Sequence, residues 1–137
     1  MKVVTHLVFP GNCQAALQFY ESVLGARIRQ LFPYRGSPME SMVPAQMKDK
    51  VLHAVLEIGD NILMATDRVG RTGSDGMSGF AITLGVDTPA EAERLLAALA
   101  AGGEITMPLQ ETFWARRFGM LVDRFGVPWM INCDKAA

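Results

Sequence analysis

The sequence predicts an α+β fold in which two βαβββ modules form a curled mixed sheet around a central cleft, with the helices on its convex side. The order strand, helix, strand, strand, strand occurs twice in the chain, at an offset of about 75 residues. The length of 137 residues is that of one ordinary domain. Half of the residues are hydrophobic and a fifth are charged, which supplies a core and excludes global disorder. We expect one domain, with modules over about residues 1–67 and 79–137.

The first module begins with a strand and an amphipathic helix. The β-branched run Val3–Phe9 predicts the strand, and Pro10 and Gly11 end it. Asn12 is a good N-cap, and apolar residues follow it at helical spacing. Gly25 then favours a left-handed C-cap, so the helix is predicted to end there.

Three strands and a long loop complete the first module. Ala26–Tyr34 predicts a strand. Arg35–Lys50 predicts a loop, because its glycine and prolines disrupt regular secondary structure, and its methionines make this loop apolar. Val51–Ile58 and Ile62–Thr66 flank a tight-turn signal and predict an antiparallel hairpin. The glycine-rich segment Asp67–Ser78 is expected to be a flexible connector.

The second module repeats this order. Phe80–Val86 predicts its first strand, and Thr88 with Glu91 forms a capping box around Pro89. The helix that starts there is predicted to end at the pair Gly102-Gly103. The remaining predicted strands are Glu104–Glu111, about Phe113–Asp123, and Val127–Cys133, with the last hairpin turn at Arg124-Phe125-Gly126.

Charge and cysteine content exclude several classes of function. Thirteen basic and fourteen acidic residues give a net charge of −1, which disfavours nucleic acid and anionic membranes as partners. The apolar run before Pro10 is too short for a signal peptide or a membrane span, so a cytoplasmic protein is expected. Cys13 and Cys133 lie far apart without metal-ligand spacing and are expected to be reduced thiols. A buried, inert Cys13 is favoured over a catalytic one.

Alternation along two strands separates a side that faces a helix from a side that lines the predicted cleft. His53 and Glu57 lie four residues apart on one strand and share the cleft side, where histidine can act as an acid or a base near neutrality. A satisfied histidine and a solvated carboxylate are the alternative, which we favour because the sequence shows no third, orienting group. The cleft side carries His53, Val55 and Glu57 in the first module and Ala81, Thr83 and Gly85 in the second.

Several short motifs together resemble the vicinal oxygen chelate superfamily of glyoxalases and bleomycin-resistance proteins, and within it the PhnB-like branch. The resemblance covers almost the whole chain. It implies paired βαβββ modules, homodimers and a ligand site inside the curled sheet. The motifs are Phe9-Pro10-Gly11-Asn12, Ala15-Ala16-Leu17, Phe19-Tyr20, Leu24-Gly25, His53-Ala54-Val55-Leu56-Glu57-Ile58-Gly59, Leu63-Met64-Ala65-Thr66-Asp67 and Asp123-Arg124-Phe125-Gly126-Val127-Pro128-Trp129.

Metal enzymes of this superfamily take ligands from the first and last strands of each module. The resemblance places these positions at His6 and Ala81 in the first strands and at about Met64 and Met130 in the last strands. One imidazole and two soft thioethers do not suit hard, oxygen-binding metals. We therefore predict no cofactor, with a divalent metal as the disfavoured alternative and His6 as its ligand, and we expect His6, Met64 and Met130 to line the ligand cleft.

Trp114, Arg116 and Arg117 form a further candidate cluster. Tryptophan can stack on a planar ligand, and arginine can bind a carboxylate or a phosphate. The alternative for Trp114 is a core or dimer contact. Trp129 is opposite in phase to Met130, so it is predicted to pack under a helix.

The sequence favours a small-molecule binding protein of the PhnB-like type, independent of metal, with an apolar cleft lined by methionine. Whether it catalyses a reaction is left open. One alternative is a metal-dependent lyase, isomerase or dioxygenase that uses His6 with His53 or Glu57. Another is an antibiotic-sequestering resistance protein, which the near-zero net charge disfavours because cationic drugs are best held by an acidic cleft.

Overall fold

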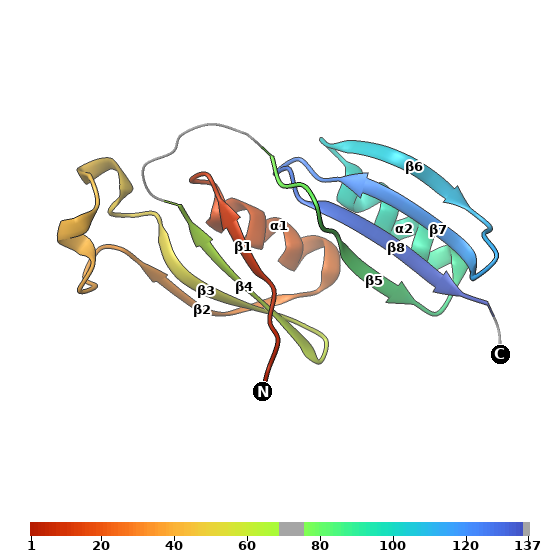
Figure 1. Cartoon of the computed structure of the whole chain (residues 1–137), viewed down its shortest axis with the longest axis horizontal. Helices are drawn as coiled ribbons and strands as arrows, with labels where there is room; N and C mark the ends of the chain where they lie inside the picture. The colour runs from red at the N-terminus through yellow and green to blue at the C-terminus, as the bar shows by residue number, and fades with distance from the viewer. Residues whose placement is uncertain (69–75, 136–137) are drawn as a thin grey trace. The chain divides into compact units, whose positions relative to one another are not determined.

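Each half of the chain forms one four-stranded mixed sheet with one helix against it (Figure 1). The computed structural model describes residues 1–68 and 76–135. The chain divides into two compact units, Met1–Ser74 and Asp75–Ala137, which we call unit 1 and unit 2. The two predicted βαβββ modules are thereby confirmed.

In unit 1 the first and last strands are parallel neighbours, and the other pairings are antiparallel. The strand order across the sheet is β1-β4-β3-β2. Two short 3-10 turns lie in the loop between the second and third strands, a segment that is otherwise irregular as predicted. The elements are β1 (His6–Phe9), α1 (Cys13–Leu24), β2 (Arg27–Pro33), the turns Glu40–Met42 and Ala45–Met47, β3 (Val51–Ile58) and β4 (Asn61–Asp67).

Unit 2 repeats this topology, with the strand order β5-β8-β7-β6 and a parallel pairing of its first and last strands. The remaining pairs are antiparallel, and the predicted turn at Arg124-Phe125-Gly126 joins the last two strands. The elements are β5 (Ile82–Val86), α2 (Pro89–Ala100), β6 (Glu104–Gln110), β7 (Ala115–Val122) and β8 (Pro128–Asp134).

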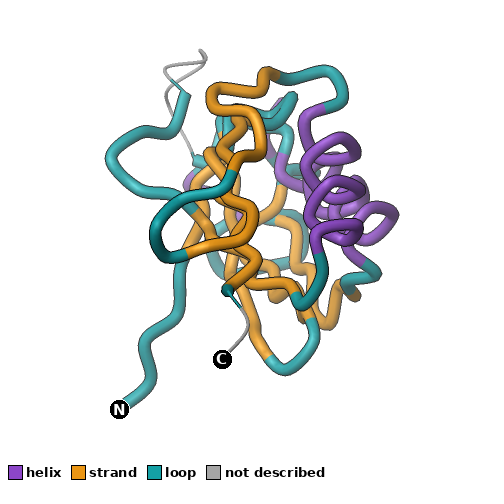
Figure 2. The backbone as a smooth tube through the Cα atoms, turned by 90° about the vertical axis from the view of Figure 1, so that its right-hand side faces the viewer, coloured by secondary structure: helices purple, strands orange, loops and turns teal. Residues whose placement is uncertain are grey.

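Each core lies between a helix and one face of its own sheet (Figure 2). The apolar stripe of each helix is buried there, as its 3.6-residue spacing predicts. In the described part of the chain no helix has the length and apolar character needed to cross a membrane. The buried helix residues are Cys13, Ala16, Leu17 and Tyr20 in α1 and Ala92, Leu95, Leu96 and Leu99 in α2.

The two helices differ in how their N-termini are capped. The hydroxyl of Thr88 accepts a hydrogen bond from the Glu91 amide at 3.2 Å, as predicted. The Glu91 carboxylate pairs with Arg94 at 2.7 Å, so the predicted return bond of the capping box is replaced by a helix-surface ion pair. Asn12 makes no side-chain cap bond, which corrects the prediction for α1. Instead the Cys13 amide donates to Asp67 Oδ1 at 3.0 Å, across 54 residues of sequence.

The predicted element boundaries need two further corrections. β1 starts at His6 and β5 at Ile82, so the apolar residues before them are not part of the sheets. Asp67, which was expected in a flexible connector, is the buried last residue of β4. Much of that predicted connector, residues 69–75, lies outside the described residues.

Candidate functional site

Three methionines form a row across the unit 2 sheet. Met107 lies opposite Met120, Met120 lies opposite Met130, and Met130 lies opposite Thr83 on β5. Trp129 and Ile131, which flank Met130, are fully buried on the α2 side, so alternation places the row on the opposite face. We call Thr83, Met130, Met120 and Met107 the methionine row. Sequence reasoning identified Thr83 and Met130 but missed the other two, because register shifts between β6 and β7 leave no signal in the sequence.

An aromatic cluster lies beside this row. Trp114 is 45% exposed, and its indole N–H donates to Asn132 Oδ1 at 3.1 Å. Its ring centroid is 5.2 Å from that of Phe118 and 4.8 Å from that of Phe113, both in edge-to-face geometry. Asn132 lies opposite Phe118 in the sheet, two residues along β8 from Met130. Trp114 thus lies partly exposed beside the methionine row, and its role in ligand binding stays a prediction.

The two arginines of the predicted Trp114 cluster donate hydrogen bonds to backbone carbonyl groups. Arg116 donates to the carbonyl of Asp87 at 2.7 Å and to that of Asp134 at 3.0 Å. Arg117 donates to the carbonyl of Arg116 at 2.8 Å and lies in register with buried Cys133. Alternation thus places Arg117 on the face that carries α2, and the structure does not bring it together with the methionine row.

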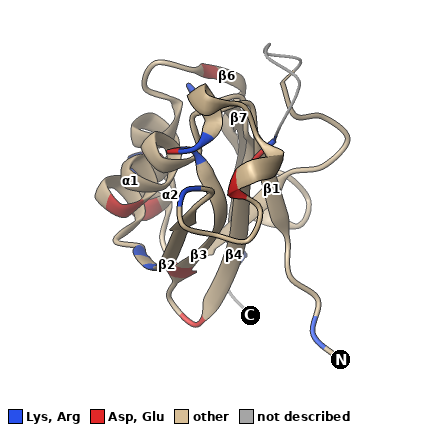
Figure 3. Ribbon diagram, turned by 90° about the vertical axis from the view of Figure 1, so that its left-hand side faces the viewer, with Lys and Arg blue, Asp and Glu red and all other residues tan. Residues whose placement is uncertain are grey.

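In unit 1 the equivalent row begins with His6, which lies opposite Met64, which in turn lies opposite Val55. The register therefore makes Thr83, rather than Ala81, the unit 2 counterpart of His6. The predicted position, Ala81, is wrong because the α2 cap is Thr88 and the link from the first strand to the helix cap is shorter in unit 2 than in unit 1. Figure 3 shows β3 and β4 drawn tan over most of their length, with few charged residues.

His6 and His53 converge over β4. Their ring centroids are 6.0 Å apart, with the ring planes at 53°, although β1 and β3 lie on opposite sides of β4. Desolvation by the surrounding protein atoms lowers the pKa of His6 from its ordinary value, and the nearby His53 lowers this pKa further. The lowered pKa favours the neutral form of His6, in which one ring nitrogen carries a lone pair.

Glu57 shares this face with His53, as predicted, but is engaged with other side chains. Its carboxylate oxygens lie 3.3 Å from Arg27 Nη2 and 3.3 Å from Arg29 Nη1. A carboxylate that already pairs with two guanidinium groups must give up those ion pairs to coordinate a cation. The structure therefore pairs His53 with His6 more closely than with Glu57.

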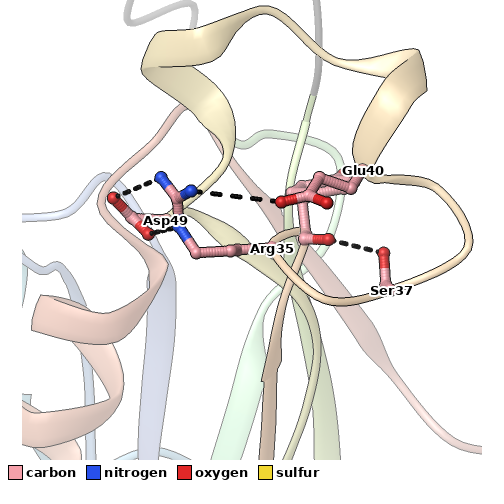
Figure 4. Close-up of polar contacts among 5 residues, drawn as sticks. Arg35, Ser37, Glu40 and Asp49 are labelled. Carbon is pink, nitrogen blue, oxygen red and sulfur yellow. Dashed lines mark hydrogen bonds and ion pairs between the residues drawn. The ribbon is translucent and has the colours of Figure 1, made fainter.

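A cavity of about 340 Å³ lies under the loop that joins β2 to β3, with Phe32, Leu52 and His53 among its lining residues. Arg35 at its rim is fixed by a bidentate contact with Asp49, at 2.7 and 3.2 Å, and by Glu40 at 4.0 Å (Figure 4). The hydrogen bonds from Arg35 lower the pKa of Asp49. His53 thus contributes to the wall of an apolar cavity as well as to the pair with His6.

The donors at the family's metal-ligand positions do not fit a hard divalent cation. Unit 1 offers the imidazole of His6 and the thioether of Met64, and unit 2 offers the hydroxyl of Thr83 and the thioether of Met130. Mg²⁺, Mn²⁺ and Fe²⁺ sites use carboxylates and imidazoles. Within residues 1–68 and 76–135 no three His, Cys, Asp or Glu side chains are gathered for such a site.

Cys13 is expected to be unreactive in the folded protein. It is fully buried, and burial, together with the adjacent Asp67, raises the pKa of its thiol to about 12. At pH 8 about one molecule in 10⁴ then carries the nucleophilic thiolate. Labelling with an aromatic disulfide reagent, followed by peptide mapping, should modify Cys13 only after denaturation in urea. Rapid modification of the native protein at Cys13 would contradict this.

Comparison with known proteins agrees with the topology. Residues 3–131 match the Glyoxalase/Bleomycin resistance protein/Dioxygenase superfamily. Protein YjdN of Escherichia coli K12 is 36% identical over 143 residues, which cover 98% of this chain and 97% of YjdN. The structure of protein PA1353 from Pseudomonas aeruginosa is 46% identical with a TM-score of 0.87, covering 99% of both chains. A PhnB protein from Bacillus cereus shares the fold at 24% identity and a TM-score of 0.80, covering 97% of this chain and 99% of its own. The chain belongs to the glyoxalase/bleomycin resistance protein/dioxygenase superfamily, the vicinal oxygen chelate fold that its motifs predict.

Proposed function

We propose that this protein binds a small, planar, largely apolar molecule on the face of the unit 2 sheet that carries the methionine row, without a hard divalent cation. The observation that carries the proposal is the direct cross-strand register of Met107, Met120, Met130 and Thr83. Thioether side chains are flexible and polarisable, so they adapt to an irregular apolar ligand and make favourable contacts with its ring.

The side chains around the methionine row would orient a bound ligand. Trp114 and Phe118 offer aromatic faces and edges on which a planar molecule can pack. The hydroxyl of Thr83 and the amide of Asn132 are neutral polar groups on neighbouring strands. Small-molecule sites typically combine an apolar wall with a few such polar groups. A neutral ligand with one hydrogen-bonding substituent matches this set.

The proposal is tested by NMR of protein with ¹³C-labelled methionine methyl groups, titrated with indole as the probe. The nine methionines report on separate places in the chain, and we expect the largest shifts at Met107, Met120 and Met130. Met120→Lys should weaken indole binding at least about tenfold, because it puts a charge at the centre of an apolar surface. The matched control is Met42→Lys, since Met42 is 72% exposed in the β2–β3 loop and should have no effect.

Addition of EDTA should leave indole binding unchanged. Binding that needs added Mn²⁺, Ni²⁺ or Zn²⁺, or shifts confined to methionines outside the row, would contradict the proposal. If Met120→Lys does not fold, Trp114→Ala provides the second test, because it removes the aromatic wall from a half-exposed position. Unchanged indole affinity in folded Trp114→Ala would also count against the site.

A metal-dependent lyase, isomerase or dioxygenase is the second candidate, and the convergence of His6 and His53 favours it. The ion pairs of Glu57 with Arg27 and Arg29 oppose it, because they occupy the one nearby carboxylate of the predicted set. Metal analysis after purification under mild conditions separates the candidates. Stoichiometric Fe, Mn, Ni or Zn that is lost in His6→Ala would favour the enzyme over metal-independent binding.

We further propose a second copy of the chain as partner and the cytoplasm as location. Phe113 is 88% exposed, and an exposed aromatic ring beside Trp114 is typical of an association surface. Cys13 and Cys133 are free thiols, which is usual in a reducing compartment. Light scattering should give the mass of a dimer, and a monomer at working concentration would contradict the association.

A further inference from the structure

His6, His53 and Met64 lie on the face of the unit 1 sheet that α1 does not cover. His6 on β1 and Met64 on β4 lie directly opposite each other in a parallel pair. Leu7 and Phe9, which alternate with His6, are buried on the α1 side, as are Leu63 and Ala65 around Met64. His6 and Met64 therefore share the other face.

His53 reaches the same place from the far side of β4. It lies two residues before Val55, which is opposite Met64, so alternation gives His53 and Met64 the same face. β1 and β3 flank β4, yet the ring centroids of His6 and His53 are 6.0 Å apart. Both imidazoles must therefore lean inward over β4, where Met64 lies between their strands.

The ring separation matches two imidazoles on one ion. A metal with bonds of about 2.0 Å to ring nitrogens lies about 3 Å from each ring centre, which puts the two centres about 5–6 Å apart. Since His6 is exposed and His53 is half-buried, an ion can enter from solvent.

The charge and the chemical softness of the imidazole and thioether ligand atoms determine which metal ion this site favours. Two imidazoles and a thioether bring no negative charge, and Glu57 on the same face already pairs with Arg27 and Arg29. Hard divalent cations need carboxylate or other oxygen ligands, whereas thioether and imidazole ligands suit copper, and thioether selects its monovalent state. We propose that His6, His53 and Met64 bind one Cu(I) ion. This site lies in unit 1 and does not rest on the ligand binding proposed for unit 2.

The test is an anaerobic titration of tag-free protein with Cu(I), in ascorbate, against a chromophoric Cu(I) chelator. We expect one Cu(I) per chain, with affinity at least about tenfold lower in each of His6→Asn, His53→Gln and Met64→Leu. The matched control is Met42→Leu, because Met42 is 72% exposed in the β2–β3 loop. Its Cu(I) affinity should equal that of the wild type.

A second measurement separates this site from the thiols. Ag(I) serves as a redox-inert probe and should shift the ring signals of His6 and His53 and the methyl signal of Met64. Cys13→Ala and Cys133→Ala should keep the Cu(I) stoichiometry, since both thiols are buried. Stoichiometric binding that is lost in the cysteine variants, that is unaffected by His53→Gln, or that is equally weakened by Met42→Leu would overturn the proposal. Folding of each variant is checked by circular dichroism before titration.

Discussion

Asp67→Ala is expected to lower the free energy of unfolding by about 3–5 kcal/mol, since each buried N–H left without its acceptor costs about 1–3 kcal/mol. Asp67 is 1% exposed. Its Oδ1 accepts from the Cys13 amide at 3.0 Å, and its Oδ2 accepts from the Val51 amide at 2.9 Å. One carboxylate therefore joins the start of α1, the start of β3 and the end of β4. Urea unfolding followed by far-ultraviolet circular dichroism measures the loss.

Two variants sharpen this prediction. Asp67→Asn keeps one oxygen but turns an NH₂ group toward a backbone N–H, so it should be destabilising to a smaller extent. Asp87→Ala is the matched control, because Asp87 is an exposed aspartate and should change stability by less than about 0.5 kcal/mol. Equal stability of Asp67→Ala and Asp87→Ala would show that the carboxylate does not hold these elements together.

Trp129→Ala is expected to cost a similar amount, about 3–5 kcal/mol, from the lost burial of a large side chain and the cavity that remains. Trp129 is fully buried, and its indole N–H donates to Asp123 Oδ2 at 2.9 Å. Asp123 Oδ1 accepts from the amides of Phe125 and Val127 at 2.8 and 3.0 Å. The indole thus fixes the carboxylate that shapes the β7–β8 turn.

Trp129→Phe separates the two contributions, because it keeps most of the apolar volume and removes the N–H donor. We expect it to cost about 1–3 kcal/mol. Trp114→Phe is the control at the half-exposed tryptophan and should cost less than about 1 kcal/mol. The readout is circular dichroism, because both substitutions change the fluorescence. A Trp129→Ala protein as stable as Trp114→Phe would contradict the structural role of Trp129.

Local patterns were sufficient for most of the fold. The helical spacing that ends at Gly25, the Thr88 cap and the turn before Val127 are all encoded within a few neighbouring residues, and each is confirmed. The buried phase of Trp129 followed from strand alternation and is also confirmed. These features depend on interactions at short sequence separation, which periodicity and capping preferences report directly.

The candidate sites were only partly visible in the sequence. His6, His53 and Met64 were each identified as residues that face the cleft, but their convergence depends on how β1 and β3 pair with β4. Met107 and Met120 were missed because they join the row through irregular register between β6 and β7. Arg117 was predicted beside Trp114, but its pairing with Cys133 puts it on the α2 face.

By itself the sequence determined the two βαβββ modules, their helices and the family, because these follow from hydrophobic period, turn residues and short motifs. The tertiary structure decided which side chains meet. It replaced Asn12 by Asp67 as the partner of the α1 N-terminus, brought the rings of His6 and His53 within 6.0 Å of each other, and aligned three methionines beside Thr83. The physical reason is that strand register and parallel pairing are set by the packing of whole sheets, so a shift of one residue exchanges the two faces while the local pattern stays the same.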